Sequence, residues 1–313
     1  MIMVRESLLA GTCLAVVFYC LLMDSAPGQT TGLDALYVQQ NGGAIDNINT
    51  VTGTSVNLAA FPTDYWNGAA YDHQNGLLYI DNIGEANFTT NQVITNTIYS
   101  FNPLNPGAGV TEVGTIAGQS AFTGAGFYNG LYYTIGTGSN QLEAYNLSAA
   151  GGPNLVSSQT LGGLGSGITG LSLGDIDFVG NSLWVSAGTL TSTAAGAGVS
   201  STYTLYHYTN VSNVTTPVLA VSEGTEIGVG IAYDYIRGQL IAFNSDGTIA
   251  QVNQSTGAES GSITLSGPAF TNAGAGDFAI VPEPGTYALW SMGLVFSLVF
   301  AHRALRQRSI ASV

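Results

Sequence analysis

The chain has 313 residues, 42 of them glycine, and only 8% of its residues are charged. It contains no lysine, its net charge is −14 at pH 7, and Arg237 is the only basic residue between Gln29 and Val281. Binding to nucleic acid requires clustered basic side chains, so the composition excludes nucleic acid as a ligand. The length leaves room for one large β domain or two small ones, with a core sufficient to fold.

The N-terminal segment has the parts of an export signal. Arg5 supplies a positive charge, Leu8 to Met23 form an apolar stretch, and small residues follow in SAPGQT. We expect residues 1–28 to be a signal peptide that signal peptidase removes between Gly28 and Gln29. A retained membrane anchor is the alternative.

Both cysteines lie inside this apolar stretch, at Cys13 and Cys20. A lipid-modified cysteine needs a small residue before it, and Tyr19 precedes Cys20, so a lipoprotein signal is disfavoured. The mature body would therefore have no disulfide, no thiol nucleophile and no thiolate metal site.

Two incomplete segments near the ends of the body complement each other. Residues Ala35 to Phe61 form strand-like runs that lack a first strand, and Gly276 to Val281 form a lone first strand, GDFAIV. Joined, they make one unit from both ends of the chain, which would protect the sheet edges that an open β repeat exposes.

Between these ends, four segments share one pattern of an aromatic-bearing strand, a tight turn and a second strand of alternating apolar residues. Each is followed by two more strand-like runs, and the units are roughly 50 to 57 residues apart. Four short strands per unit are typical of a propeller blade. The four segments are GAAYDHQNGLLYI from Gly68, GAGFYNGLYYTI from Gly124, GDIDFVGNSLWVS from Gly174 and GIAYDYIRGQLIAF from Gly230.

The predicted fold is therefore all-β: a β-propeller over residues 29–281 with five four-stranded blades, closed by pairing of the N- and C-terminal strands. The segment STAAGAGVSSTYTLYHYTNVSNV has room for a further strand pair. Six blades or a β-sandwich thus stay open as alternatives.

Several motifs that are associated with catalysis lack the context that they need. GSGITG at Gly165 to Gly170 fits a dinucleotide-binding pattern, and Ser172 in GLSLG fits a nucleophile elbow, but neither precedes a helix. Of the two histidines of the body, His73 lies in a turn and His207 in an aromatic strand, and both are interpreted as surface or core residues. We predict no catalytic residue.

Carboxylates are the better candidates for chemistry. Asp175 and Asp177 lie two apart in a strand and so share a face, close enough to bind a cation. Asp72, Asp177 and Asp234 each precede a leucine by six residues. This recurrence favours capping of turns. The four aspartates also remain weak candidates for a Ca²⁺ site, and we expect no other cofactor.

Aromatic side chains offer a second kind of candidate site. Tyr65 and Trp66 in FPTDYWNG are predicted to be exposed and able to stack on sugar rings, whereas Trp184, in an alternating strand, is predicted to be core.

The C-terminal tail has three parts in order. The triplet Pro282, Glu283 and Pro284 is followed by an apolar stretch from Tyr287 to Ala301, and then by three arginines, Arg303, Arg306 and Arg308. This arrangement resembles the PEP-CTERM sorting signal of exported proteins in Gram-negative bacteria that often make exopolysaccharide. The resemblance implies that residues 282–313 are a sorting signal and that an exosortase-type membrane enzyme is a partner.

The apolar stretch of the tail predicts one transmembrane helix. Its 15 residues give about 22 Å of helix, short for a bilayer core of about 30 Å. The arginines would lie at the inner interface and stop transfer by the positive-inside rule. We therefore expect transient insertion into the inner membrane before processing.

Together these features predict an exported, non-enzymatic protein of the cell surface or extracellular matrix that binds polysaccharide or a surface partner. One alternative is a secreted glycan-acting enzyme that uses Asp175 and Asp177 as acid and base. The other is a structural spacer without a specific ligand.

Overall fold

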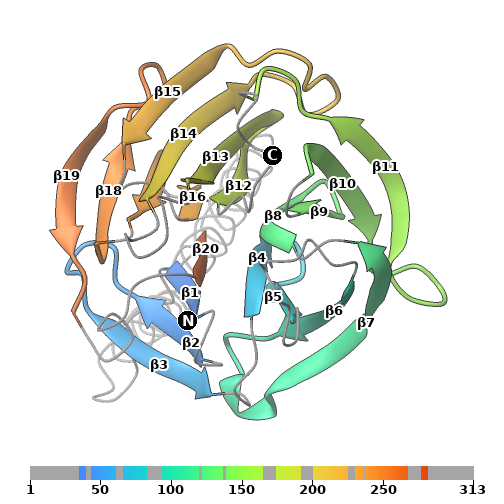
Figure 1. Cartoon of the computed structure of the whole chain (residues 1–313). Helices are drawn as coiled ribbons and strands as arrows, with labels where there is room; N and C mark the ends of the chain where they lie inside the picture. Colours follow the sequence, from blue (N-terminus) through green and yellow to red (C-terminus); the bar gives the residue numbers. More distant parts are fainter. Residues whose placement is uncertain are drawn as a thin grey trace, which may run out of the picture.

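The computed structural model shows a five-bladed β-propeller, in which five antiparallel sheets of four strands surround a common axis (Figure 1). The predicted fold and blade number are confirmed, and neither a sixth blade nor a sandwich is present in the described part. The structure describes residues 35–39, 44–60, 66–82, 94–119, 122–136, 139–164, 174–191, 200–224, 230–235, 237–244, 246–266 and 276–280.

The strands are numbered in chain order, and each blade runs from an inner to an outer strand. Blade 1 contains β20 (Gly276–Ile280), β1 (Ala35–Gln39), β2 (Ala44–Ile48) and β3 (Ser55–Ala60). Blade 2 contains β4 (Trp66–Asp72), β5 (Leu77–Asn82), β6 (Ile94–Phe101) and β7 (Val110–Gln119), with the short helix η1 (Pro106–Ala108) before β7. Blade 3 contains β8 (Phe122–Tyr128), β9 (Leu131–Gly136), β10 (Gln141–Asn146) and β11 (Asn154–Thr160). Blade 4 contains β12 (Gly174–Val179), β13 (Ser182–Thr191), β14 (Ser200–Tyr208) and β15 (Leu219–Gly224). Blade 5 contains β16 (Gly230–Asp234), β17 (Gln239–Phe243), β18 (Thr248–Val252) and β19 (Glu259–Thr264).

Blade 1 closes the ring with strands from both ends of the body. Strand β20 pairs antiparallel with β1, with Ala35 opposite Ile280 and Gln39 opposite Gly276. This pairing confirms the predicted split unit. Where the other blades have a turn from the first to the second strand, blade 1 has the two places at which the chain enters and leaves the ring.

Apolar residues gather where neighbouring blades face each other. All seven residues of β4 are buried, while the outer strand β19 has only exposed and partly buried positions. Aromatic rings fill the space between blades, as where Tyr37 of blade 1 stacks on Phe243 of blade 5 with ring centroids 4.7 Å apart. Inner strands, covered on both sides, therefore need runs of apolar residues, whereas outer strands do not.

The turn from the third to the fourth strand has the same local chemistry in every blade. It begins with an asparagine whose side-chain oxygen accepts a hydrogen bond from the backbone N–H two residues later. Such Asx turns hold the chain in a reversal without needing help from neighbouring blades. The five residues are Asn49, Asn102, Asn146, Asn210 and Asn253.

Close backbone contacts join the outer strand of one blade to the following blade. After β11, Gly162 passes so near the next blade that an added Cβ would lie 1.9 Å from the carbonyl oxygen of Thr215. At the ring closure, Gly53 has φ +72°, and an added Cβ would lie 2.4 Å from the carbonyl oxygen of Thr264. Both contacts require glycine, which explains part of the high glycine content.

The predictions for both ends of the chain concern residues outside the described part. These are the signal peptide, the cleavage position at Gly28 and Gln29, the Pro282 to Pro284 triplet, and the arginines at 303, 306 and 308. Within the part of the chain that the structure describes, no helix is long and apolar enough to cross a membrane.

Candidate functional site

Asp175 and Asp177 hold two neighbouring blades together. Both lie on β12, and each accepts a hydrogen bond from a backbone N–H of β16 in blade 5: Asp175 Oδ2 from Ile231 at 2.9 Å and Asp177 Oδ2 from Tyr233 at 2.5 Å. Their Oδ1 atoms accept the N–H of the following residue, at 2.7 Å in each case. The two carboxylates share a face, as predicted, and link blade 4 to blade 5.

Asp72 and Asp234 instead cap turns within their own blades, as predicted. Asp72 Oδ1 accepts backbone hydrogen bonds from Gln74 at 2.9 Å and Asn75 at 3.2 Å, and Asp234 Oδ1 accepts one from Arg237 at 3.0 Å. Both residues end an inner strand.

The prediction that Asp177 caps a turn in the same way is wrong. Asp72 pairs with Leu77 and Asp234 with Gln239, so each borders a four-residue turn, whereas Val179 pairs with Ser182 across a two-residue turn. Because this turn is two residues shorter, the position six residues before Leu183 lies within β12 and not at its end. There, the Asp177 side chain meets the next blade instead of its own turn.

No group of three or more His, Cys, Asp or Glu side chains comes together among the described residues. In the four aspartates that were candidates for Ca²⁺, carboxylate oxygens already accept hydrogen bonds from backbone or side-chain donors.

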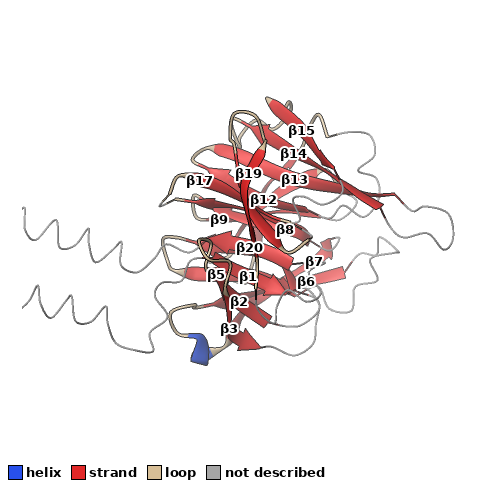
Figure 2. Ribbon diagram, turned by 90° about the vertical axis from the view of Figure 1, so that its left-hand side faces the viewer, coloured by secondary structure: helices blue, strands red, loops and turns tan. Residues whose placement is uncertain are grey.

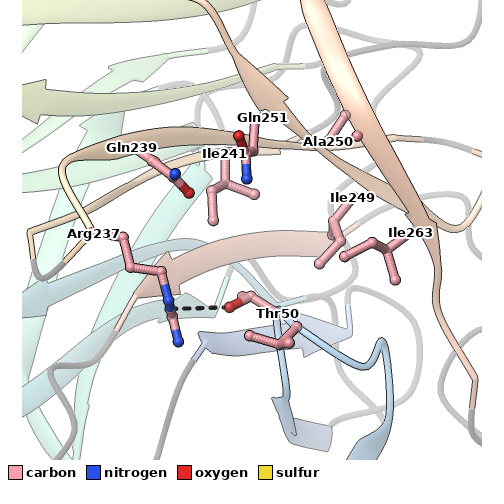
Figure 3. A pocket seen from close by; sticks show the side chains of 10 residues that line it. Thr50, Arg237, Gln239, Ile241, Ile249, Ala250, Gln251 and Ile263 are labelled. Atoms are coloured by element: carbon pink, nitrogen blue, oxygen red, sulfur yellow. Dashed lines mark hydrogen bonds between the residues drawn. The ribbon is translucent and has the colours of Figure 1, made fainter.

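A pocket lies at the seam between blades 5 and 1 (Figure 3). It has a volume of about 170 Å³, and its lining combines the amides of Gln239 and Gln251 with the aliphatic side chains of Ile241, Ile249 and Ile263. In Figure 3, the two glutamines come from β17 and β18, and Thr50 faces them from the turn after β2. The pocket therefore offers hydrogen-bonding groups beside apolar surface.

Arg237 brings a neutralised charge to this pocket. Its guanidinium Nη1 lies 2.6 Å from Asp234 Oδ2 and 3.2 Å from Thr50 Oγ1. The carboxylate of Asp234 is fully buried, while the arginine side chain is 31% exposed. Because a buried carboxylate holds the guanidinium, the pocket presents donors without net positive charge.

A second group of interest surrounds the end of the central axis. His73 in the turn after β4 contacts Tyr235 in the turn after β16, with ring centroids 4.4 Å apart, although blade 1 stands between these two blades in the ring. Burial lowers the pKa of His73 to about 4, against an opposing effect of Asp72, so this histidine is neutral at pH 7. The Tyr235 hydroxyl also donates to the carbonyl oxygen of Phe178 in blade 4 at 3.1 Å.

The prediction that Trp66 is exposed for sugar stacking is wrong. Its side chain is 2% exposed, because Trp66 begins an inner strand and packs between blades 1 and 2, in edge contact with Tyr99. Tyr65, Ser172 and the GSGITG segment lie outside the described residues. Trp184 is 1% exposed, as predicted for a core residue, and stacks on His207 at 4.1 Å between ring centroids.

Sequence reasoning missed the pocket because its lining comes from two blades that only ring closure brings together. Gln239 and Gln251 lie on neighbouring strands, but Thr50 is far from both in sequence. Arg237 was the one available signal, since a single basic residue in an acidic body needs a partner.

Comparisons with known proteins identify no family for this chain. No protein-family model matches the chain, and no curated protein matches it. The chain resembles a solved structure described as a nidogen/laminin complex, with 11% identity and a TM-score of 0.46, over 80% of this chain and 98% of that one. It also resembles a chain of a mitotic checkpoint complex, with 13% identity and a TM-score of 0.40, over 77% and 67% of the two chains.

Proposed function

We propose that this protein is an exported, non-enzymatic component of the cell surface or extracellular matrix that binds polysaccharide through the pocket between blades 5 and 1. Its C-terminal tail is processed by an exosortase-type membrane enzyme. The order of Pro282, Glu283 and Pro284, the apolar stretch and the three arginines supports the sorting part of this proposal. The geometry of the pocket supports the binding part.

The observation that carries the binding proposal is the mixed lining of the pocket. A sugar ring presents hydroxyl groups at its edge and C–H groups on its faces, and the pocket pairs two glutamine amides with isoleucine side chains. At about 170 Å³, the pocket is smaller than the roughly 300 to 1,000 Å³ of sites for drug-sized ligands. It suits one sugar unit of a chain that continues into solvent.

The neutral pairing of Arg237 with Asp234 favours a neutral or weakly charged glycan. A strongly anionic polymer would gain little from a guanidinium that a carboxylate already holds, and the acidic body would repel it. We therefore expect uncharged sugars to bind more tightly than polyuronates.

The surroundings of Asp175 and Asp177 argue against the enzyme alternative, which would use these two residues as acid and base. Every oxygen of Asp175 and Asp177 accepts a backbone N–H, which stabilises the charged form of both groups. A glycosidase acid must instead carry a proton to the leaving oxygen of the substrate. The glycan array described next distinguishes the proposed binding from the spacer alternative.

A glycan array, followed by calorimetry on the best ligand, tests the proposal. We expect Gln251→Leu and Gln239→Leu each to weaken binding about tenfold or more. Each change removes an amide that would hydrogen-bond to the sugar, and a tenfold change in Kd corresponds to about 1.4 kcal/mol. Gln74→Leu, at an exposed position in the turn after β4, is the matched control and should bind as the wild type does.

Two results would contradict the proposed binding. Equal affinity in all three variants would place the ligand elsewhere, and no binding to any glycan would favour the spacer. Release of shortened products from the bound glycan would instead establish the enzyme alternative.

A further inference from the structure

Both ends of the body leave the ring at one place. Ile280, the last residue of β20, lies opposite Ala35, the first residue of β1. This place corresponds to the turn after the first strand in the other blades, and β20 packs between the inner strands β4 and β16. The tail therefore begins beside the turns that carry His73 and Tyr235.

The sorting triplet follows the folded body almost without a linker. Glu283 is three residues beyond Ile280, and an extended chain spans at most about 3.6 Å per residue. Three residues can therefore extend at most about 11 Å from the Cα of Ile280. A tail held in a bilayer must then bring this side of the propeller close to the membrane.

We call this side the turn face and define it by the turns from first to second and from third to fourth strand. In Figure 2, the helix η1, which belongs to one of these turns, marks the corresponding edge of the molecule. None of these turns contains Asp or Glu, although the chain has 19 acidic residues, and they contain one arginine, Arg237. The turns are residues 49–54, 73–76, 102–109, 129–130, 147–153, 180–181, 209–218, 235–238 and 253–258.

The connections at the opposite ends of the strands do contain carboxylates. In sequence, the connections from second to third strand, and from each blade to the next, contain Asp64, Glu85, Glu226 and Asp246. Asp246, the one of these that the structure describes, is exposed. The turns of this face thus contain no carboxylate of their own. The buried Asp72 and Asp234 border two of them, and in sequence Asp34 and Glu283 lie near the residues at which the chain enters and leaves the ring.

Four of the seven large apolar side chains that are exposed in the described part of the chain lie on the turn face, and the other three lie on the outer strands β3 and β11. Val51, Leu104 and Val218 are 63%, 64% and 63% exposed, and all three lie in turns from third to fourth strand. Tyr235, at 44%, lies in the turn after β16. Exposed apolar groups on turns that contain no carboxylate suit the interface of an anionic bilayer, which attracts apolar and basic groups and repels acidic ones.

We propose that the turn face lies against the lipid bilayer while the tail holds the chain there, with the opposite ends of the strands directed away from the membrane. This orientation rests on the proposed insertion of the tail. Three features agree on it: the point at which the chain leaves the ring, the absence of carboxylates from the turns and the exposed apolar residues. The pocket between blades 5 and 1, lined in part by Thr50, Val51 and Arg237, adjoins the same face.

Lipid quenching of single labelled cysteines tests the orientation in the full-length chain. Because Cys13 and Cys20 are the only cysteines, replacing both with serine leaves a background free of thiols. Bimane is attached at Leu104→Cys and Val218→Cys on the turn face, and at Ser297→Cys in the apolar stretch of the tail. The comparison positions are Thr95→Cys and Asp246→Cys, which are exposed and lie at or beside connections from second to third strand. The proteins are reconstituted in vesicles of phosphatidylethanolamine and phosphatidylglycerol that contain nitroxide-labelled lipid.

We expect quenching at positions 297, 104 and 218, at least twofold stronger than at 95 and 246. Quenching at 297 with none at 104 and 218 would overturn the orientation and leave the tail insertion standing; a turn face reserved for a protein partner would give this result. Equal quenching at all four body positions would also overturn it. No quenching at 297 would refute the proposed insertion of the tail and, with it, the orientation.

Discussion

At the scale of single residues, aspartates are largely internal parts of this propeller. Asp46, Asp72, Asp81, Asp175 and Asp234 are all buried. Asp175 accepts a hydrogen bond from a backbone N–H of the next blade, and Asp72 and Asp234 accept hydrogen bonds from backbone N–H groups in their own turns. The acidic composition therefore overstates the charge that the described surface presents to solvent.

Asp81 differs from these aspartates. It is fully buried on β5, and neither carboxylate oxygen has a hydrogen-bond partner among the described residues. Burial raises its pKa well above the usual value, so the folded protein favours the protonated form. In the unfolded chain, this group ionises near pH 4.

Asp81→Asn should therefore change how stability depends on pH. In the wild type, this group has no effect below about pH 4, where both states are protonated, and it lowers stability as pH rises from there toward the folded pKa. We expect Asp81→Asn to remove this decline and to raise the free energy of unfolding at pH 7 by about 1 kcal/mol or more. Urea denaturation at pH 4 and pH 7 is the measurement. Asp246→Asn, at an exposed site, is the control, and equal pH dependence of Asp81→Asn and the wild type would contradict the expectation.

The two roles of the other aspartates predict different costs of substitution. Asp72→Asn should cost little, because asparagine also caps turns. Asp175→Ala leaves the buried N–H of Ile231 without its acceptor and should lower the free energy of unfolding by about 2 kcal/mol or more, as measured by urea denaturation.

Because the carboxylates of these aspartates already accept hydrogen bonds, millimolar Ca²⁺ should not raise the melting temperature. A rise of several degrees that Asp177→Ala abolishes would show instead that calcium binds there.

At the scale of elements, β20 is the strand on which closure depends. It pairs with β1 and packs against the inner strands of blades 2 and 5. Without it, blade 1 would expose the edge of β1 and open the ring. It is also the last described element before Pro282, Glu283 and Pro284, so the proposed processing of the tail would have to leave it intact.

Deleting Gly276 to Ile280 should cost far more stability than trimming the residues before Leu33. We expect the deletion to abolish a single cooperative thermal transition, since it removes the partner of β1, and the trimmed protein to melt like the wild type. Circular dichroism during heating measures both. Equal melting temperatures would show that β20 contributes little to closure.

At the scale of the whole molecule, one end of the propeller axis combines the exit of the chain with turns free of carboxylates. If the tail is removed as proposed, the mature protein should lack Tyr287 to Val313. Glu283→Ala, or replacement of Arg303, Arg306 and Arg308, should leave the tail in place, because either change removes a part of the sorting signal. Intact mass of the protein recovered from the cell surface decides this, with Asp246→Asn as a variant that should be processed normally. A wild-type mass that includes Tyr287 to Val313 would refute sorting.

Local pattern alone predicted an all-β propeller of five blades and the pairing of both ends, because the alternation of strands and turns repeats in four segments and is split once. The structure excluded the alternatives of six blades or a sandwich for the described residues. Asp72 and Asp234 as turn caps were also predictable, since capping uses neighbours in sequence. The role of Asp177, the burial of Trp66 and the pocket of Gln239, Gln251 and Arg237 were decided by tertiary structure. Each depends on the distance between blades, and only closure of the ring brings together strands that are far apart along the chain.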